Sequence, residues 1–275
     1  MLFEDYPPQE PLSENGVIYN REMRKRGEGV EGIDIRHGED AHQSLLLFPA
    51  AKPNGSVLAF MVGGGWTNAY KELLAFMAPA FSAAGVTFAS LGYRLAPGHH
   101  FPDGWDDAAA GMAWLHRNVA GYGGDPGRLF VGGWSAGGHY ASLLACRRDW
   151  QGPLGLPEEV IRGCLCISGV FDFTPGNGMG VRPRFLGPEP LGNDVHASPL
   201  FHLDRCPPPM LLAHGSDDFP HLAMQAKKME RVLQVRGADV QRIELADRTH
   251  FTAAYQCADE GSPWLAAALA WMSAH

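Results

Sequence analysis

Residues 129–138 read L-F-V-G-G-W-S-A-G-G, and this stretch predicts the centre of the fold. A short apolar strand over 129–131 leads into a glycine-rich corner, and a helix is expected over 136–146. At the corner, residues 133–137 form the pattern G-x-S-x-G around Ser135. A serine on so sharp a turn has a strained backbone, so the residues beside it must be small. Its hydroxyl then projects above the edge of a sheet; the alternative is an ordinary packing turn.

The length and composition indicate one large core. The chain has 275 residues, of which 45% are hydrophobic and 19% charged, so we expect a single α/β domain over 1–275. The net charge of −8 argues against nucleic acid and anionic membranes as main partners. No apolar run approaches the roughly 20 residues of a membrane span.

Strand and helix patterns alternate along the chain, which is typical of a mostly parallel sheet covered by helices on both faces. Eight strands are predicted, at 33–35, 44–48, 57–62, 86–91, 129–131, 163–167, 210–213 and 240–245. Helices are predicted at 68–84, 103–119, 136–146, 222–235 and 264–272, with a short one over 20–26. The first two strands are expected to form an antiparallel pair.

Two segments stand outside this alternation. Residues 1–28 form a polar N-terminal extension, and 170–206 is a Gly- and Pro-rich stretch that is long for a loop. Such an insertion is usually a lid or a binding loop. The start of the chain lacks the apolar run of a signal peptide, and the five cysteines follow no disulfide framework. A cytoplasmic protein with reduced thiols is therefore expected.

A nucleophilic serine needs a base and a group that orients the base. In a parallel sheet such groups gather beyond the carboxyl ends of strands. After the strand at 240–245 comes His250, and after the strand at 210–213 come Asp217 and Asp218. A turn of the form H-G-x-x-D favours Asp218, with Asp217 as the alternative.

The run Val62-Gly63-Gly64-Gly65-Trp66 directly follows a strand. Glycines allow backbone N–H groups to turn toward a developing oxyanion, so Gly64, Gly65 and Ala136 are the predicted donors. A dinucleotide-binding loop is the competing interpretation, but Asn68 stands where its last glycine belongs. The histidines show no metal-ligand spacing such as H-E-x-x-H. We therefore expect no metal and no cofactor.

The chain resembles the hormone-sensitive-lipase-like α/β hydrolases, and within them the kynurenine formamidase (arylformamidase) branch. The motifs that carry the resemblance cover roughly 57–255: Gly63-Gly64-Gly65-Trp66, Tyr93-Arg94-Leu95-Ala96-Pro97, Phe101-Pro102 with Asp106-Asp107, Gly123-Gly124-Asp125-Pro126, Gly132 to His139, Ala197-Ser198-Pro199-Leu200 and Gln225. The resemblance implies an α/β-hydrolase fold and a serine hydrolase acting on a carboxylic ester, or on an N-acyl or N-formyl amide, of a small molecule.

One departure from the family pattern keeps a second function open. The family's oxyanion loop begins with a histidine that braces the loop, whereas this chain has Val62. Either other contacts hold the loop, or the hole is loose and the enzyme slow. The alternative function is therefore a hydrolase-fold protein that binds a small ligand without turning it over.

Aromatic residues beside these loops suggest the wall of a substrate pocket, with core packing as the alternative for each of them. The candidates are Trp66, Trp134, Phe171, Phe173 and Phe251. Two arginines of the insertion, Arg182 and Arg184, could meet a substrate carboxylate or could simply be solvated. The oligomeric state is not indicated.

Overall fold

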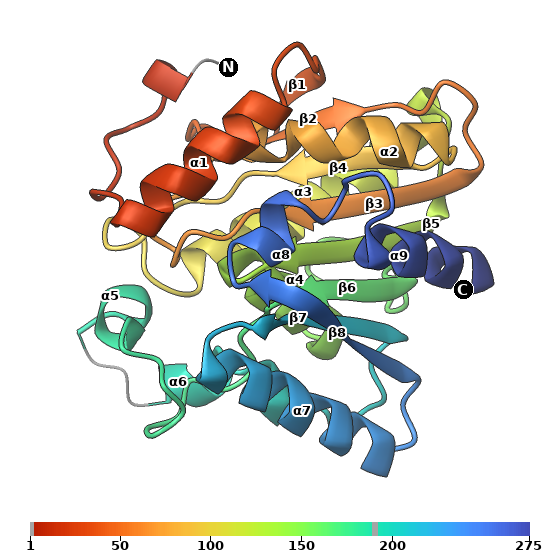
Figure 1. Ribbon diagram of the computed structural model, residues 1–275. Helices are drawn as coiled ribbons and strands as arrows, with labels where there is room; N and C mark the ends of the chain where they lie inside the picture. Colours follow the sequence, from red (N-terminus) through yellow and green to blue (C-terminus); the bar gives the residue numbers. More distant parts are fainter. Residues whose placement is uncertain (1–2, 189–191) are drawn as a thin grey trace.

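The computed structural model describes residues 3–188 and 192–275 and is built around one eight-stranded sheet (Figure 1). The spatial order of the strands is β1-β2-β4-β3-β5-β6-β7-β8. Their bounds are β1 (Ile33–Arg36), β2 (Ser44–Phe48), β3 (Gly55–Met61), β4 (Thr87–Leu91), β5 (Gly124–Trp134), β6 (Gly163–Ile167), β7 (Met210–Asp217) and β8 (Val240–Thr249). β2 pairs antiparallel with β1 and with β4, and the other pairs are parallel. The predicted fold, a mostly parallel sheet with an antiparallel opening pair, is confirmed.

Helices cover both faces of the sheet. In Figure 1, α1, α2, α8 and α9 lie in front of it, and α3 and α4 lie behind it. The helices are α1 (Glu14–Arg26), α2 (Ala78–Ala83), α3 (Asp103–Asn118), α4 (Ala136–Cys146), α5 (Arg182–Leu186), α6 (Asn193–His196), α7 (Pro220–Val235), α8 (Thr252–Tyr255) and α9 (Pro263–Ala274). Short 3₁₀ helices occur at Phe3–Asp5, Lys71–Met77, Val119–Tyr122 and Pro199–Phe201. Strands β2, β4 and β6 are buried along their whole length, because helices or neighbouring segments shield both of their faces.

The prediction of a single helix at 68–84 is wrong in detail. The structure has a 3₁₀ helix over Lys71–Met77, and the α-helix α2 begins only at Ala78. Pro79 lies in the first turn of α2, where its missing N–H costs no hydrogen bond; further along an α-helix it would break one.

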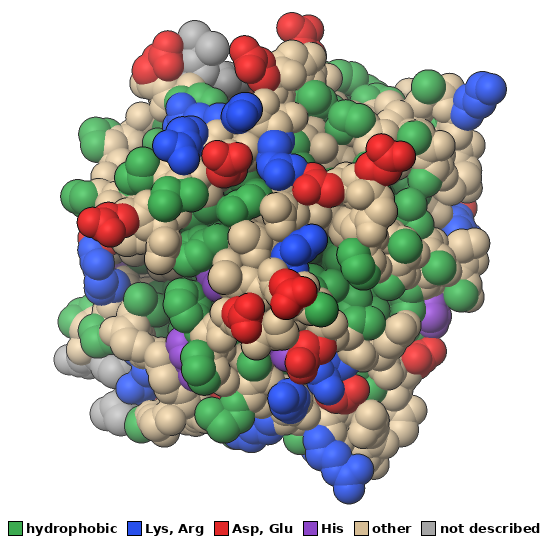
Figure 2. Space-filling view, in the orientation of Figure 1, with side chains coloured by type: hydrophobic (Ala, Val, Ile, Leu, Met, Phe, Trp, Pro, Cys, Tyr) green, Lys and Arg blue, Asp and Glu red, His purple; other side chains and the backbone are tan. Residues whose placement is uncertain are grey.

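The N-terminal helix is longer than predicted. α1 starts at Glu14 rather than near residue 20, because the Ser13 hydroxyl accepts the backbone N–H of Gly16 at 3.1 Å and caps the helix. Figure 2 shows Lys and Arg side chains gathered over α1, with acidic side chains among them. A mixture of both charges is typical of a solvated helix face.

The insertion at 170–206 joins β6 to β7 and contains α5, α6 and one 3₁₀ turn; its residues 189–191 lie outside the described part. In Figure 1, α5 and α6 lie at the lower left, on the same side of the molecule as the start of α1. The N-terminal extension and the insertion therefore approach the same end of the sheet.

Candidate active site

Ser135 occupies the turn between β5 and α4 with φ +54° and ψ −117°, a conformation that side-chain-bearing residues rarely adopt. A Cβ added at Gly133 would lie 2.3 Å from the backbone of Gly137. A Cβ added at Gly137 would lie 2.0 Å from the Met61 carbonyl oxygen on β3. Both glycines are therefore required by close backbone packing, which is the steric reason for the G-x-S-x-G pattern.

The structure brings Ser135, His250 and Asp218 into one hydrogen-bonded row. Ser135 Oγ lies 3.0 Å from His250 Nε2, and His250 Nδ1 lies 2.9 Å from Asp218 Oδ1. Because a carboxylate oxygen accepts, Nδ1 carries the proton and Nε2 is free to accept from the serine hydroxyl. Asp218 is buried, whereas Asp217 is exposed and makes no such contact. Of the two open candidates, Asp218 is the one placed at the imidazole.

Two further donors hold the Asp218 carboxylate. Ser168 Oγ donates to Oδ2, and the backbone N–H of Phe219 donates to Oδ1 at 2.7 Å. Burial raises the pKa of Asp218, but the hydrogen bond and charge of His250, together with these two donors, outweigh burial and leave the pKa lowered. Ser168 was missed from the sequence, although it directly follows the apolar run at 163–167 and therefore ends a neighbouring strand.

The loop after β3 runs alongside the serine. A Cβ added at Gly63 would lie 2.8 Å from Ser135 Cβ, so the loop passes in direct contact with the turn. Gly64 has φ +144° and Gly65 has φ +62°. The Gly64 carbonyl accepts the N–H groups of Thr67 at 3.2 Å and Asn68 at 3.0 Å, which closes a tight turn. Both glycines line the same cavity as Ser135.

At position 62, where the family pattern has a bracing histidine, a different side chain supports the loop. Tyr93 Oη donates to the carbonyl oxygen of Val62 at 2.7 Å, and both residues are fully buried. Tyr93 follows β4, the strand beside β3, so the start of the glycine loop is tied to the neighbouring strand. The valine at position 62 therefore does not leave the loop carbonyl unpaired.

These groups come from the carboxyl ends of five strands that are neighbours in the sheet. In spatial order, β3 is followed by the glycine loop, β5 by Ser135, β6 by Ser168, β7 by Asp218 and β8 by His250. The loops of a parallel sheet meet at this edge, so residues up to 115 positions apart can lie within hydrogen-bonding distance. A nucleophile, a base, an orienting acid and a glycine loop are the parts of acyl-transfer chemistry.

A comparison with protein families matches residues 58–254 to the alpha/beta hydrolase fold. The chain belongs to this family. Among curated relatives, this alpha/beta hydrolase is 30% identical over 240 residues to Esterase LipC of Mycobacterium tuberculosis, covering 78% of this chain and 58% of the relative. It is 27% identical over 238 residues to a probable isoprenylcysteine alpha-carbonyl methylesterase of Arabidopsis thaliana, covering 78% and 50% of the two chains. The chain thus spans little more than half the length of these relatives.

Solved structures share the fold of this alpha/beta hydrolase. The thermophilic carboxylesterase EstE1, cloned from a metagenomic library, superposes with a TM-score of 0.77 at 21% identity, covering 94% of this chain and 95% of that one. A Pyrobaculum calidifontis esterase gives a TM-score of 0.75 at 20% identity, covering 94% of this chain and 93% of that one. At identities this low, the comparison shows only that the fold is shared.

This member of the alpha/beta hydrolase family has a cavity of about 510 Å³ above Ser135. Trp66, Trp134 and Phe251 line it, as the sequence suggested. Its other walls come from the N-terminal extension, the insertion and the start of α7; they include Leu12, Tyr19, Val170, Met179, Val181, Phe219, His221 and Leu222. The extension and the insertion therefore both take part in enclosing the serine, which the sequence indicated only for the insertion.

The prediction that Phe171 and Phe173 line this cavity is wrong. Both side chains are buried in the core, at 1% and 0% exposure, because the chain after β6 turns them inward. Arg182 is paired with Asp194 at 3.0 Å, and Arg184, which does line the cavity, is paired with Glu10 of the N-terminal extension. Each arginine thus already has a carboxylate partner within the protein.

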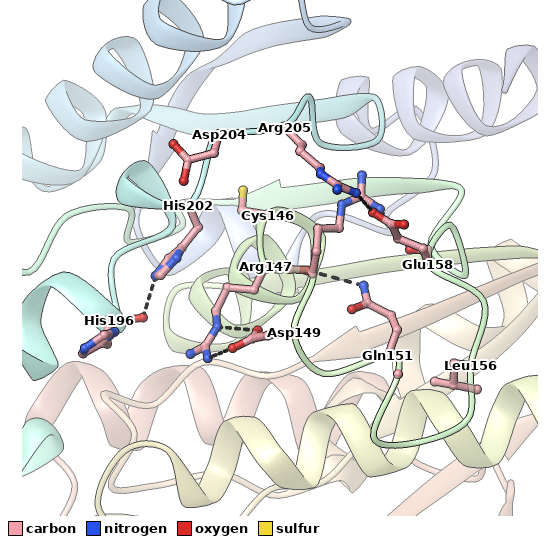
Figure 3. Close-up of a pocket in the computed structure, with 12 residues that line it drawn as sticks. Cys146, Arg147, Asp149, Gln151, Leu156, Glu158, His196, His202, Asp204 and Arg205 are labelled. Carbon is pink, nitrogen blue, oxygen red and sulfur yellow. Dashed lines mark hydrogen bonds and ion pairs between the residues drawn. The ribbon is translucent and has the colours of Figure 1, made fainter.

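A second, larger cavity of about 760 Å³ lies at the opposite end of α4 from Ser135 (Figure 3). Four of its charged side chains form two ion pairs: Arg147 pairs with Asp149, and Arg205 pairs with Glu158. The thiol of Cys146 also lines it, and burial raises the pKa of that thiol far above its usual value. The hydrogen-bonded row of Ser135, His250 and Asp218 lies at the smaller cavity.

Within 3–188 and 192–275, no group of three or more His, Cys, Asp or Glu side chains is arranged to hold a metal ion. Over the same residues, no helix is both long and apolar enough to cross a membrane.

The two loop glycines give a matched pair of substitutions. A Cβ at Gly64 would lie 1.6 Å from the Asn68 carbonyl oxygen, whereas a Cβ at Gly65 meets nothing closer than 4.0 Å. We expect Gly64→Ala to displace the loop and lower kcat by about 10²- to 10³-fold, the effect of losing one oxyanion donor. Gly65→Ala should keep kcat within about ten-fold and cost roughly 1 kcal/mol of stability. Equal losses of kcat in the two variants would contradict this account of the loop.

His139, on the first turn of α4, is a second buried histidine near the site. Burial lowers its pKa to about 3, against the opposing effect of a hydrogen bond to the Ala197 carbonyl. Below the ordinary histidine pKa of about 6.5, the unfolded chain therefore binds a proton at this residue, whereas the folded protein does not. The contribution of His139 to the free energy of unfolding is fully present above about pH 6.5 and is lost as the pH falls toward 3.

Removing that histidine should flatten the acid dependence of stability. Between about pH 7 and pH 5, the unfolding free energy of the wild type is expected to fall by about 2 kcal/mol more than that of His139→Leu. Urea unfolding at the two pH values measures the difference. Parallel losses in both proteins would show that His139 takes up a proton in the folded state.

Proposed function

We propose that this protein is a serine hydrolase that cleaves carboxylic esters of small molecules through an acyl-enzyme. The observation that carries the proposal is the row Ser135 Oγ, His250 Nε2 at 3.0 Å, and Asp218 Oδ1 at 2.9 Å from His250 Nδ1. The esterase names of the curated relatives support the same reaction class.

In the first half-reaction, Ser135 Oγ attacks the ester carbonyl while His250 Nε2 accepts the hydroxyl proton. Asp218 stabilises the imidazolium and holds the ring in place. The negative oxygen of the tetrahedral intermediate faces the backbone N–H groups of Gly64, Gly65 and Ala136. His250 then protonates the departing alcohol.

In the second half-reaction, water replaces the alcohol. His250 takes a proton from the water as it attacks the acyl-enzyme carbonyl, and the same N–H groups hold the second oxyanion. The proton returns to Ser135 Oγ when the acid leaves. Apart from the substrate and water, both halves use only the residues named here.

The walls of the cavity favour a small substrate with an apolar acyl or aryl group. Aromatic and aliphatic side chains dominate its lining, and Trp134 is fixed there because its indole N–H donates to the His250 carbonyl at 3.0 Å. The ion pair between Arg184 and Glu10 lies at the cavity, so charged substrates must compete with it. N-acyl and N-formyl amides require the same acyl-transfer steps and belong to the proposal as a second substrate class.

The alternative, a ligand-binding protein without turnover, drew its support from Val62. The hydrogen bond from Tyr93 to the Val62 carbonyl removes most of that support, because the loop start is paired and buried. Parallel assays with short-chain p-nitrophenyl esters and N-formylkynurenine test the proposal. Ester hydrolysis that is lost with Ser135 supports it, and the absence of turnover on both substrate types contradicts it.

A further inference from the structure

Trp66, the last residue of the glycine loop, has an unusual backbone. Its φ of +63° lies in the left-handed region, which a bulky aromatic residue rarely occupies. Such a conformation persists only where surrounding contacts hold it, and it is most often found at functional sites. The residue is 2% exposed, so these contacts come from the protein rather than from water.

Contacts with three segments of the chain hold Trp66 in place. Its carbonyl accepts the Ala96 N–H at 2.9 Å, and its ring stacks on Phe185 of the insertion at 4.5 Å between centroids. Its indole Nε1–H donates to Nδ1 of His139 at 3.1 Å. Of the three, only the His139 contact links Trp66 to α4, the helix that begins beside Ser135.

The tautomer of His139 is set by its other ring nitrogen. Nε2 lies 2.6 Å from the carbonyl oxygen of Ala197, which can only accept, so Nε2 carries the hydrogen. Nδ1 is then left as an acceptor aimed at the indole of Trp66. The ring is fully buried among Trp66, Phe173 and Phe185, which leaves it no water to replace either partner.

We propose that His139 is a positioning residue for the oxyanion hole, acting by holding Trp66 and with it the peptide groups of Gly64 and Gly65. The inference rests on the proposed function. The hole is assembled from two separate elements, the glycine loop after β3 and the N–H of Ala136 at the start of α4. The hydrogen bond from Trp66 to His139 joins these two elements directly.

Loss of this hydrogen bond raises the free energy of the transition state more than that of the bound substrate. Without its acceptor, Trp66 can relax toward negative φ, which turns the peptide between Gly65 and Trp66. Gly65 then shifts, and with it the preceding peptide, which carries the Gly65 N–H. Oxyanion donors are effective only at about 2.7–3.1 Å from the charged oxygen, so a small rotation weakens them. The uncharged ester carbonyl depends far less on these donors, so kcat falls while KM changes little.

Three substitutions separate the two bonds of His139. His139→Leu removes both, and Trp66→Phe removes only the indole donor. His139→Asn offers an oxygen near the Nδ1 position that can accept from Trp66, but its side chain is too short to reach Ala197. Met112→Ala, a truncation in the buried core of α3, serves as a destabilised control that leaves the loop untouched. Thermal unfolding of each variant shows that it is folded at the assay temperature.

With p-nitrophenyl acetate we expect His139→Leu and Trp66→Phe each to lower kcat by about 10- to 100-fold, with KM within about three-fold of wild type. The double variant should fall no further than either single one, because both remove the same bond. His139→Asn should recover most of kcat, and Met112→Ala should keep it.

Several results would overturn the inference: an unchanged kcat in His139→Leu, a loss confined to KM, single losses that multiply in the double variant, or His139→Asn no better than His139→Leu. The wild type measured in the same assay separates the two proposals. An inactive wild type rejects the proposed function and the inference that rests on it, whereas an active wild type with an unaffected His139→Leu rejects the inference alone.

Discussion

Ser135→Ala is expected to lower kcat for ester hydrolysis by at least about 10⁴-fold while leaving the protein folded. The hydroxyl oxygen is the only non-hydrogen atom removed, and in the structure it lies 3.0 Å from His250 Nε2. Without it no acyl-enzyme can form, and the remaining groups can only orient a water molecule. The strained φ of +54° is a property of the turn and is tolerated by alanine as well as by serine. Steady-state kinetics, with circular dichroism as the check on folding, measures the effect.

A matched control lies on α4, the helix that follows Ser135. The hydrogen bonds of Ser142 Oγ go to the backbone carbonyl oxygens of Gly138 and His139, and none goes to Ser135, Asp218 or His250. Ser142→Ala should therefore retain wild-type kcat. Turnover by Ser135→Ala close to that of Ser142→Ala would mean that another group carries the reaction.

The second large effect is expected from Asp218→Asn, which should reduce kcat by about 10⁴-fold. An amide in place of the carboxylate presents an N–H to His250 Nδ1 or forces the imidazole into the other tautomer, so Nε2 can no longer accept from Ser135. The substitution also removes the negative charge that stabilises the imidazolium. Asn is close in size to Asp, so the packing around the buried position changes little.

Asp217→Asn is the matched control for this prediction. Asp217 is the adjacent residue, it is exposed, and its removal changes the net charge by the same amount. Its kcat should stay within about three-fold of wild type. Because the sequence leaves both aspartates open, equal losses in the two variants, or a greater loss at Asp217, would contradict the geometry of the site.

Much of the fold follows from local patterns. The helix after the serine runs from 136 to 146 as predicted, because the glycine corner fixes its start and its apolar face is continuous. The order of strands and helices also follows from periodicity. The boundary at Pro79 was within reach of the sequence, since proline marks the first turn of a helix.

The site is predictable where a residue directly follows a strand and less so elsewhere. Ser135, Asp218 and His250 all do so. Ser168 also follows a strand, but a serine there carries no motif that marks its role. The role of the N-terminal extension at the cavity depends on packing between segments far apart in the chain, which no local pattern encodes. Phe171 and Phe251 have the same chemical character, and only the path of the backbone decides which of them enters the core.

The most direct test of the central claim, that Ser135 is a nucleophile activated by His250, is covalent labelling with a fluorophosphonate followed by peptide mass spectrometry. The account predicts one adduct, on the peptide that contains Ser135, formed rapidly by the wild type and by Asp217→Asn and far more slowly by Asp218→Asn. An unlabelled Ser135 in folded wild-type protein, or an adduct on a different residue, would contradict it.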